Sequence, residues 1–154
     1  ISKNVYSKDF SIVNQYNKRP FFNTVYKYIY NYVLSKNEKS KAKKYTDSII
    51  SKMNLKYIQS IKVRNLTQNQ FRWVDIAAKI ASNTKVIFID EIDSGFNVQR
   101  LKNLSKILYR KCNYDGVTLV ATCSNFQSFT NLTSVLISIN NGRISSIRSK
   151  NKRK

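Results

Sequence analysis

The sequence predicts an α/β fold, in which helices cover a parallel sheet, and three observations support this prediction. Residues 86–89, Val-Ile-Phe-Ile, are all apolar and mostly β-branched, as in a strand buried on both faces. Two adjacent carboxylates, Asp90 and Glu91, follow at the end of the strand, where parallel sheets hold their ligands. A helical pattern over 97–112 and a second apolar run, 117–121, expected as another buried strand, then complete a parallel strand–helix–strand crossover.

The composition is strongly basic, with 28 Lys and Arg against 8 Asp and Glu and a formal net charge of +20. Such a charge can indicate a nucleic-acid or membrane-surface ligand. The basic residues are nevertheless spread along the chain and are dense only in 36–44 and 148–154. Lys, Asn, Ile and Tyr are all abundant, as an AT-rich coding sequence would produce. We therefore expect no specific nucleic-acid partner.

Several classes of site and segment are not expected. The chain has no His and only two cysteines, Cys112 and Cys123, which form no CxxC pair. This composition predicts neither a zinc site nor a disulfide framework. No long uncharged apolar run is present, so no membrane-spanning segment is expected.

The first half of the sequence alternates apolar periodic segments with polar ones. Thr24 is a suitable N-cap, and apolar residues at helical spacing follow it. The expected elements are a short strand within 1–14, a loop over 15–23, a helix over 24–34, a basic linker over 35–44, a second helix marked by Ala42, Tyr45, Ile49 and Met53, and a connector over 55–65.

A third helix begins after Thr67, another suitable N-cap, and places Trp73, Ile76, Ala77 and Ile80 on one face. Its polar face is expected to carry Arg72, Asp75 and Lys79, with Asp75 and Lys79 as an i,i+4 pair. Segments 136–140 and 143–147 flank Asn141-Gly142 and predict a β-hairpin. The tail from Arg148 is expected to be disordered.

The order of these segments resembles the later part of an ATP-binding cassette (ABC) nucleotide-binding domain, from about Phe10 to Ile147. Gln15 resembles the Q-loop glutamine, and Leu-Thr-Gln-Asn-Gln at 66–70 resembles the signature LSGGQ. Residues 86–91 resemble the Walker B strand with its catalytic glutamate, and 92–97 resemble the D-loop. The Ser-Gly within 92–97 resembles the D-loop of the half-transporters in the white-like (ABCG) branch of the family.

The resemblance implies a RecA-like P-loop NTPase sheet with an inserted helical subdomain. The implied divisions are 1–23 (the end of the core sheet and the Q-loop), 24–65 (the helical subdomain), 66–147 (the signature helix and core) and 148–154 (a basic tail). The phosphate-binding loop GxxxxGK[ST] is missing, because the three glycines, Gly95, Gly116 and Gly142, do not form it. We interpret this as a truncation before Ile1.

The resemblance also implies a site for ATP and Mg²⁺. Asp90 would bind Mg²⁺, Glu91 would act as general base on the attacking water, and Gln15 would contact both the metal and that water. Thr67 and Gln70 would meet the phosphates of a nucleotide held by an opposing subunit. The remaining nucleotide-binding candidates are Asn97, at the end of the D-loop, and Cys123, in the place of the switch histidine.

Substitutions within three of the family motifs accompany this assignment. Gln68 and Asn69 replace the two signature glycines, which normally allow close backbone approach to the nucleotide. Asn97 replaces an aspartate. Cys123 offers a thiol, a weaker and shorter hydrogen-bonding group than imidazole.

The implied function is ATP binding and hydrolysis coupled to transmembrane transport, on the cytoplasmic face of a membrane. The expected partners are a second nucleotide-binding domain and transmembrane domains in the same or another chain. The intact protein would be an ABC-type ATPase, whereas the fragment alone is expected to be inactive. Two alternatives remain open: a catalytically degenerate half with a structural or regulatory role, and a soluble ABC protein acting on nucleic acid or ribosomes.

Overall fold

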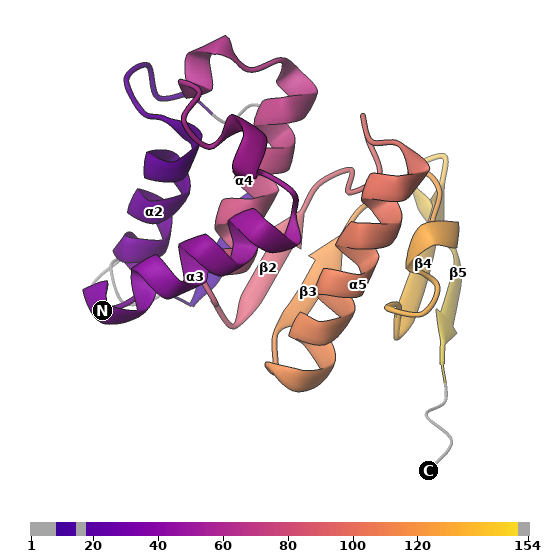
Figure 1. Cartoon of the computed structure of the whole chain (residues 1–154). Coiled ribbons are helices and arrows are strands. Elements are labelled where there is room, and N and C mark those ends of the chain that lie inside the picture. The colour runs from indigo at the N-terminus through magenta and orange to yellow at the C-terminus, as the bar shows by residue number, and fades with distance from the viewer. Residues whose placement is uncertain (1–8, 15–17, 151–154) are drawn as a thin grey trace, which may run out of the picture.

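A computed structural model of the chain describes residues 9–14 and 18–150 and shows a three-stranded sheet, four α-helices and a separate hairpin (Figure 1). Three short 3-10 helices connect these elements. The main elements are β1 (Phe10–Val13), α2 (Val25–Lys36), α3 (Lys39–Lys52), α4 (Gln68–Ala81), β2 (Val86–Ile89), α5 (Val98–Tyr114), β3 (Thr118–Ala121), β4 (Val135–Asn140) and β5 (Arg143–Ser149).

The sheet is parallel, with β2 between β1 and β3, as the sequence predicted. Val86 pairs with Phe10 on one side and with Thr118 on the other. The connection from β2 through α5 to β3 is therefore the predicted parallel crossover. All three strands end at the same edge of the sheet.

Within the described part of the chain, only one face of β1 and β2 is buried, and none of the residues of β3 is fully buried, which corrects the prediction that β2 and the strand at 117–121 are buried on both faces. Ser11, Val13, Ile87 and Ile89 are buried beneath the helices. The residues between them in the strands are open to solvent: Phe10 is 38%, Ile12 47%, Phe88 39% and Val120 50% exposed. Apolar residues on both faces of a strand indicate that burial of both faces would be favourable. They do not show that other segments of the chain pack against both faces.

The segment from 35 to 44 is largely helical, which corrects the linker predicted there. Helix α2 continues to Lys36 and α3 starts at Lys39, so only two residues separate them. The straight aliphatic side chains of lysine are compatible with helices, so a run of lysines alone does not predict a linker. The break comes from Asn37, whose side-chain amide donates to the carbonyls of Val33 (3.0 Å) and Ser82 (2.7 Å).

The hairpin of β4 and β5 is antiparallel, with Asn141 and Gly142 at its turn, as predicted. Both turn residues have positive φ (+47° and +75°), which Asn-Gly readily adopts. Strand β5 continues through Arg148 to Ser149, so the prediction of a disordered tail from Arg148 is wrong at those two positions. Among the described helices, none combines the length and apolarity that crossing a membrane requires.

Helix α4 lies at the centre of the packing and is buried over most of its length. Trp73, Ile76 and Ile80 belong to its inner face, as predicted. Asp75 and Lys79 are also buried, with 1% and 6% of their surface exposed. The predicted i,i+4 pair of Asp75 and Lys79 is therefore confirmed, but it is buried within the packing of the helices.

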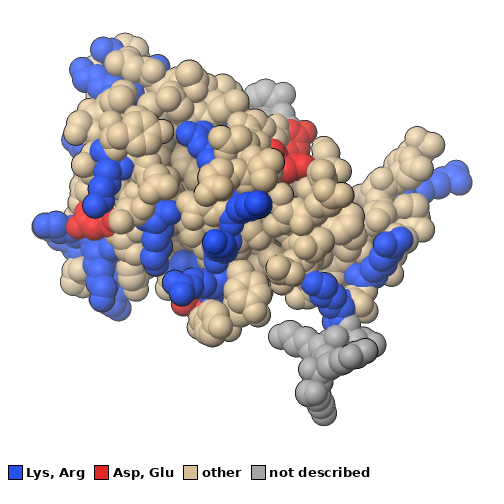
Figure 2. Space-filling model, turned by 45° about the vertical axis from the view of Figure 1, so that its right-hand side comes forward, with Lys and Arg blue, Asp and Glu red and all other residues tan. Residues whose placement is uncertain are grey.

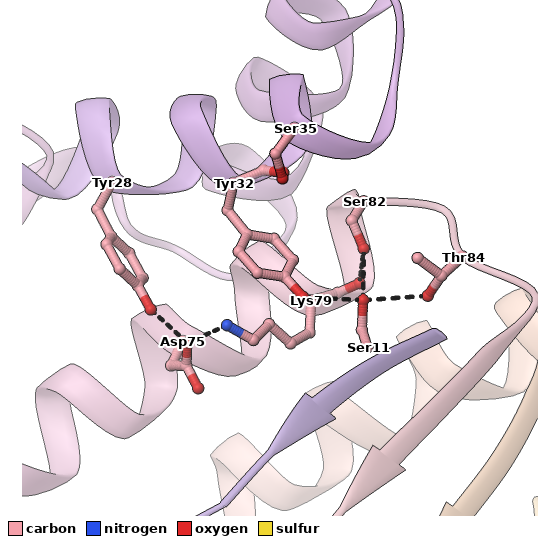
Figure 3. Close-up of polar contacts among 8 residues, drawn as sticks. All are labelled: Ser11, Tyr28, Tyr32, Ser35, Asp75, Lys79, Ser82 and Thr84. Atoms are coloured by element: carbon pink, nitrogen blue, oxygen red, sulfur yellow. Dashed lines mark hydrogen bonds and ion pairs between the residues drawn. The ribbon is translucent and has the colours of Figure 1, made fainter. Parts of the chain in front are cut away.

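The Asp75–Lys79 pair is buried because α2 packs over it (Figure 3). The Nζ of Lys79 lies 2.8 Å from Oδ1 of Asp75 and 3.7 Å from the centre of the Tyr32 ring. The Tyr28 hydroxyl donates to the same carboxylate. Burial and the charge of Asp75 raise the pKa of Tyr28 far above its ordinary value, so this hydroxyl remains a donor.

A chain of hydroxyl groups continues this network to β1 (Figure 3). The Tyr32 hydroxyl donates to Oγ of Ser11 at 3.1 Å. Ser11 also contacts the hydroxyls of Ser82 (3.0 Å) and Thr84 (3.1 Å), which follow α4. The network therefore fixes α2, both ends of the α4–β2 connection and β1 relative to one another.

We predict that Lys79→Met destabilises the chain by about 3–5 kcal/mol, because it removes the cation that compensates the buried charge of Asp75. Adding Asp75→Leu should recover most of this loss, leaving about 1–2 kcal/mol for the Tyr28 hydroxyl that loses its acceptor. Urea unfolding of the three proteins measures both effects.

The matched control is Lys102→Met, at an exposed position on α5, which should change stability by less than about 0.5 kcal/mol. If Lys79→Met is as mild as this control, the buried pair does not hold α2 on α4.

Candidate functional site

The candidate site lies where β1, β2 and β3 end, and it is built by the residues that continue those strands. The Asp90 N–H donates to the Val13 carbonyl at 3.0 Å, and the Thr122 N–H donates to the Ile89 carbonyl at 3.1 Å. The parallel ladder thus extends one residue beyond β2 and β3. Asp90 and Thr122 are brought together by this extension.

The hydroxyl of Thr122 joins the two carboxylate residues. It donates to Oδ1 of Asp90 at 2.7 Å and accepts from the Glu91 N–H, also at 2.7 Å. Sequence reasoning did not assign a role to Thr122, although a hydroxyl at the end of the strand adjacent to Asp90 was visible in the sequence. Thr122 therefore orients the Asp90 carboxylate and fixes the backbone of Glu91.

The backbone at Glu91 is in the left-handed region, with φ of +46°, which is unusual for a residue with a side chain. Arg72 of α4 supports this conformation, because its Nη2 donates to the carbonyls of both Asp90 and Glu91, the latter at 2.7 Å. The sequence placed Arg72 on the polar face of this helix but did not predict this contact. The turn after β2 is thus held by α4 on one side and by Thr122 on the other.

The segment after β3, which contains Cys123, is fixed by Asp93. The Asp93 carboxylate accepts the N–H groups of Ser124 (3.1 Å) and Asn125 (2.8 Å). Partial burial raises the pKa of the Cys123 thiol, and the Asp93 charge raises it further. The thiol is therefore neutral near pH 7, and Cys123 is not an activated nucleophile.

The start of α4 carries a reciprocal cap. Oγ1 of Thr67 accepts from the Gln70 N–H at 3.2 Å, and the Thr67 N–H donates to Oε1 of Gln70 at 2.9 Å. Thr67 is therefore the helix N-cap that the sequence predicted. Both residues assigned to phosphate contact already have intrachain partners.

The two residues that replace signature glycines also contact the chain itself. The Gln68 side chain accepts a hydrogen bond from Arg19, which also donates to the Leu66 carbonyl at 2.8 Å. The Asn69 side chain lies against Gly95, where φ is +77° and a Cβ atom would come within 2.5 Å of the Asn69 oxygen. Only glycine fits Gly95 in this arrangement.

The two other site candidates lie at the margins of this arrangement. Asn97 is the N-cap of α5, with its side-chain oxygen accepting from the Arg100 N–H at 2.9 Å. Gln15 lies outside the described residues. Of the candidates, the structure brings Asp90 and Glu91 together through Thr122 and pairs Thr67 with Gln70. Arg72 and the Asn69–Gly95 contact connect these two groups.

The described residues offer few ligands for a metal ion. No group of three or more carboxylate, thiol or imidazole side chains is close enough to hold one within this part of the chain. Asp90 with the Thr122 hydroxyl supplies a small, hard oxygen set. This set fits Mg²⁺, which commonly takes one or two protein ligands and completes its shell with water and substrate phosphates.

Comparison with solved structures gives matches over nearly the whole chain. The ATP-binding cassette MJ0796, in a dimeric post-hydrolysis state with ADP and Pi, aligns with 97% of this chain at a TM-score of 0.81 and 15% identity. An ATP-binding subunit of an ABC transporter aligns with 95% at a TM-score of 0.79 and 11% identity. CbiO1 from Clostridium perfringens, part of the CbiONQ complex, aligns with 93% at a TM-score of 0.70 and 18% identity.

The fold is that of an ABC ATP-binding cassette. This confirms the fold class predicted from the sequence, including its parallel sheet and added helices. The chain spans 68%, 61% and 58% of the lengths of these three structures. No protein-family model and no curated protein sequence matches the chain.

We predict that Thr122→Val lowers stability by about 1–2 kcal/mol, because two hydrogen bonds of the hydroxyl are lost while the β-branched shape remains. The Glu91 amide should also exchange its hydrogen faster. Thr118→Val, at an exposed position of the same strand, is the control and should have little effect on either measurement. Unchanged exchange at Glu91 would show that Thr122 does not hold this turn.

Proposed function

We propose that the intact protein binds and hydrolyses ATP and couples this to transport across a membrane. The observation that carries the proposal is the Asp90–Glu91–Thr122 arrangement at the carboxyl edge of a sheet with the ABC cassette fold. In open α/β sheets this edge is where ligands bind. The structural neighbours support the nucleotide, since one of them contains ADP and Pi.

In this proposal Asp90 binds Mg²⁺ and Glu91 acts on water. Bound Mg²⁺ would supply positive charge to the phosphates as negative charge develops on them. Thr122 holds the Asp90 carboxylate at 2.7 Å and so fixes the direction in which Asp90 offers its oxygens. Glu91, on a backbone held by Arg72 and Thr122, would orient and deprotonate the attacking water, with Gln15 contacting the same water and metal.

The same proposal assigns a role to each segment of the chain. Segment 1–23 would supply the end of the core sheet and the Q-loop, and 24–65 the helical subdomain. Segment 66–147 would supply the signature helix and the Walker B strand, with 148–154 as a basic end that begins within β5. Asn97 and Cys123 would border the nucleotide, and Thr67 and Gln70 would meet a nucleotide held by a second cassette.

An exposed aromatic pair supports a further protein partner. Phe21 and Phe22 are 57% and 81% exposed, and the Arg64 guanidinium lies 4.4 Å from the centre of the Phe21 ring. Ile61 is exposed as well, and its carbonyl accepts from the Val25 N–H at 2.9 Å, beside the backbone bridge between Thr24 and Lys62. Exposed apolar patches of this kind mark interaction sites. We assign this one to the transmembrane partner, which would place the protein at the cytoplasmic face of a membrane.

The second candidate function is a structural or regulatory role as one half of a dimer of cassettes, without efficient ATP hydrolysis. It is favoured by the cap at Thr67 and by the contacts of Gln68 with Arg19 and of Asn69 with Gly95, which fill the space that glycines would leave open.

A third candidate, a soluble ABC protein acting on nucleic acid or ribosomes, is favoured by the charge of +20. Selective RNA binding at physiological salt would support that third candidate.

We predict that Glu91→Gln in the intact protein retains ATP binding and lowers turnover by about 100-fold or more, because a positioned base is lost. Glu38→Gln, at an exposed carboxylate that pairs with Lys41 on α3, is the control and should leave turnover unchanged. Steady-state hydrolysis and nucleotide binding measure the two effects. If Glu91→Gln hydrolyses ATP at the original rate, the second candidate function is favoured.

We also predict that Cys123→His raises turnover when the partner cassette carries a glycine-rich signature. Imidazole is longer than a thiol and is a stronger hydrogen-bonding group for the transferring phosphoryl group. The gain should appear in kcat more than in ATP affinity. Cys123→Ser is the control, because its hydroxyl is no longer than the thiol and should give no gain. Equal rates for the two variants would contradict the assignment of Cys123 to the switch position.

A further inference from the structure

A cavity lies between α3 and α5, on the helical side of the sheet. The two helices meet where the Asn103 side chain donates to the Lys52 carbonyl at 3.0 Å, and they diverge from that point (Figure 1). The cleft between them has a volume of about 920 Å³. It shares no lining residue with the Asp90 edge. It is therefore a separate site.

The inner surface of the cleft is apolar. Its floor is formed by the end of α4, where Ile80 and Ala81 are buried, and by Ile49 of α3. Tyr45 and Tyr109 line the two opposite walls. A concave apolar surface of this size, with a few convergent polar groups, is typical of sites for small organic ligands.

The rim of the cleft is strongly cationic. The basic residues that line it come from α3, α5 and the end of β5: Lys44, Lys52, Lys106, Arg110, Lys111 and Lys150. The lining contains one carboxylate, Asp115, and Lys111 pairs with it at 2.8 Å. Among the described residues, Lys44, Lys52, Lys106 and Arg110 make no ion pair. Lys and Arg also far outnumber Asp and Glu on the face of the molecule shown in Figure 2.

We propose that this cleft binds a small amphiphilic organic anion, with an apolar chain or ring that carries a phosphate or carboxylate group. The apolar body would cover Ile49, Ile80 and Ala81, and the anionic group would lie between the cations of α3 and α5. An apolar floor alone would favour a neutral ligand, whereas basic residues alone would bind any anion. The combination selects a molecule that has both properties.

The site does not depend on the proposed ATPase activity, because none of its residues takes part in the proposed hydrolysis. It is nevertheless connected to that edge through α4. The floor residues Ile80 and Ala81 end the helix that begins after Thr67 and carries Arg72. A ligand in the cleft would thus contact the same helix that supports the Asp90–Glu91 turn.

Octyl phosphate, kept below its micelle concentration, is the probe for this proposal. Calorimetric titration of the 154-residue chain in 150 mM salt should give an affinity at least about tenfold higher than for inorganic phosphate, because burial of the alkyl chain adds to the ionic contact. Methyl NMR signals of Ile80, Ala81 and Ile107 should shift on binding. Equal affinity for inorganic phosphate would overturn the proposal, and so would shifts confined to the open sheet face at Ile12 and Val120.

Matched charge reversals separate the cleft from the general basic charge. The double variant Lys44→Glu with Lys106→Glu should weaken octyl phosphate binding at least fivefold. Lys43→Glu with Lys102→Glu changes the net charge equally, on the same two helices and at exposed positions that do not line the cleft, and should retain binding. Equal weakening in both variants, or no measurable binding by the unchanged chain, would refute the site.

Discussion

The pairing of β2 between two parallel strands is the constraint on which the rest of the structure depends. The last residues of the three strands, Val13, Ile89 and Ala121, therefore lie at one edge of the sheet. Two further backbone hydrogen bonds extend the strand pairing to Asp90 and Thr122. Once the strands are paired in this register, the Asp90 carboxylate and the Thr122 hydroxyl become neighbours. The strained turn at Glu91 then follows, because its N–H and carbonyl are held by Thr122 and Arg72.

Helix α4 transmits this constraint to the helical part of the chain. Its Arg72 holds the turn after β2, and its buried Asp75–Lys79 pair is covered by Tyr28 and Tyr32 of α2. A buried ion pair gains little net stability over an apolar pair of similar size. Its directional contacts nevertheless allow few alternative placements of α2 on α4. The turn at the sheet edge and helix α2 are therefore both held by α4, through side chains that lie within two helical turns of each other.

Local signals predicted much of this fold, whereas contacts between distant segments could not be read from the sequence. The caps at Thr24 and Thr67 and the turn at Asn141-Gly142 depend on neighbouring residues, so the sequence identified them. The burial of Asp75 and Lys79 depends on tyrosines more than 40 residues away. The same holds for Thr122 and Arg72, which bind Asp90 and Glu91 only after β2, β3 and α4 have come together. The apolar pattern of β2 likewise showed a preference for burial without showing that Phe88 is open to solvent.

The signature-like segment and the sheet edge differ in how closely their residues match those that the proposed chemistry requires. Gln68 accepts a hydrogen bond from Arg19, and the Asn69 side chain occupies the space beside Gly95, so a glycine at position 68 would remove that hydrogen bond and one at position 69 would empty that space. At the edge, Asp90 and Glu91 keep the residue types that the proposed chemistry requires, and Thr122 orients them. The two regions therefore differ in how far their side chains are committed to contacts within the chain. Gln68 is hydrogen-bonded to Arg19, whereas the carboxylate of Asp90, although it accepts from Thr122, remains exposed at the edge of the sheet.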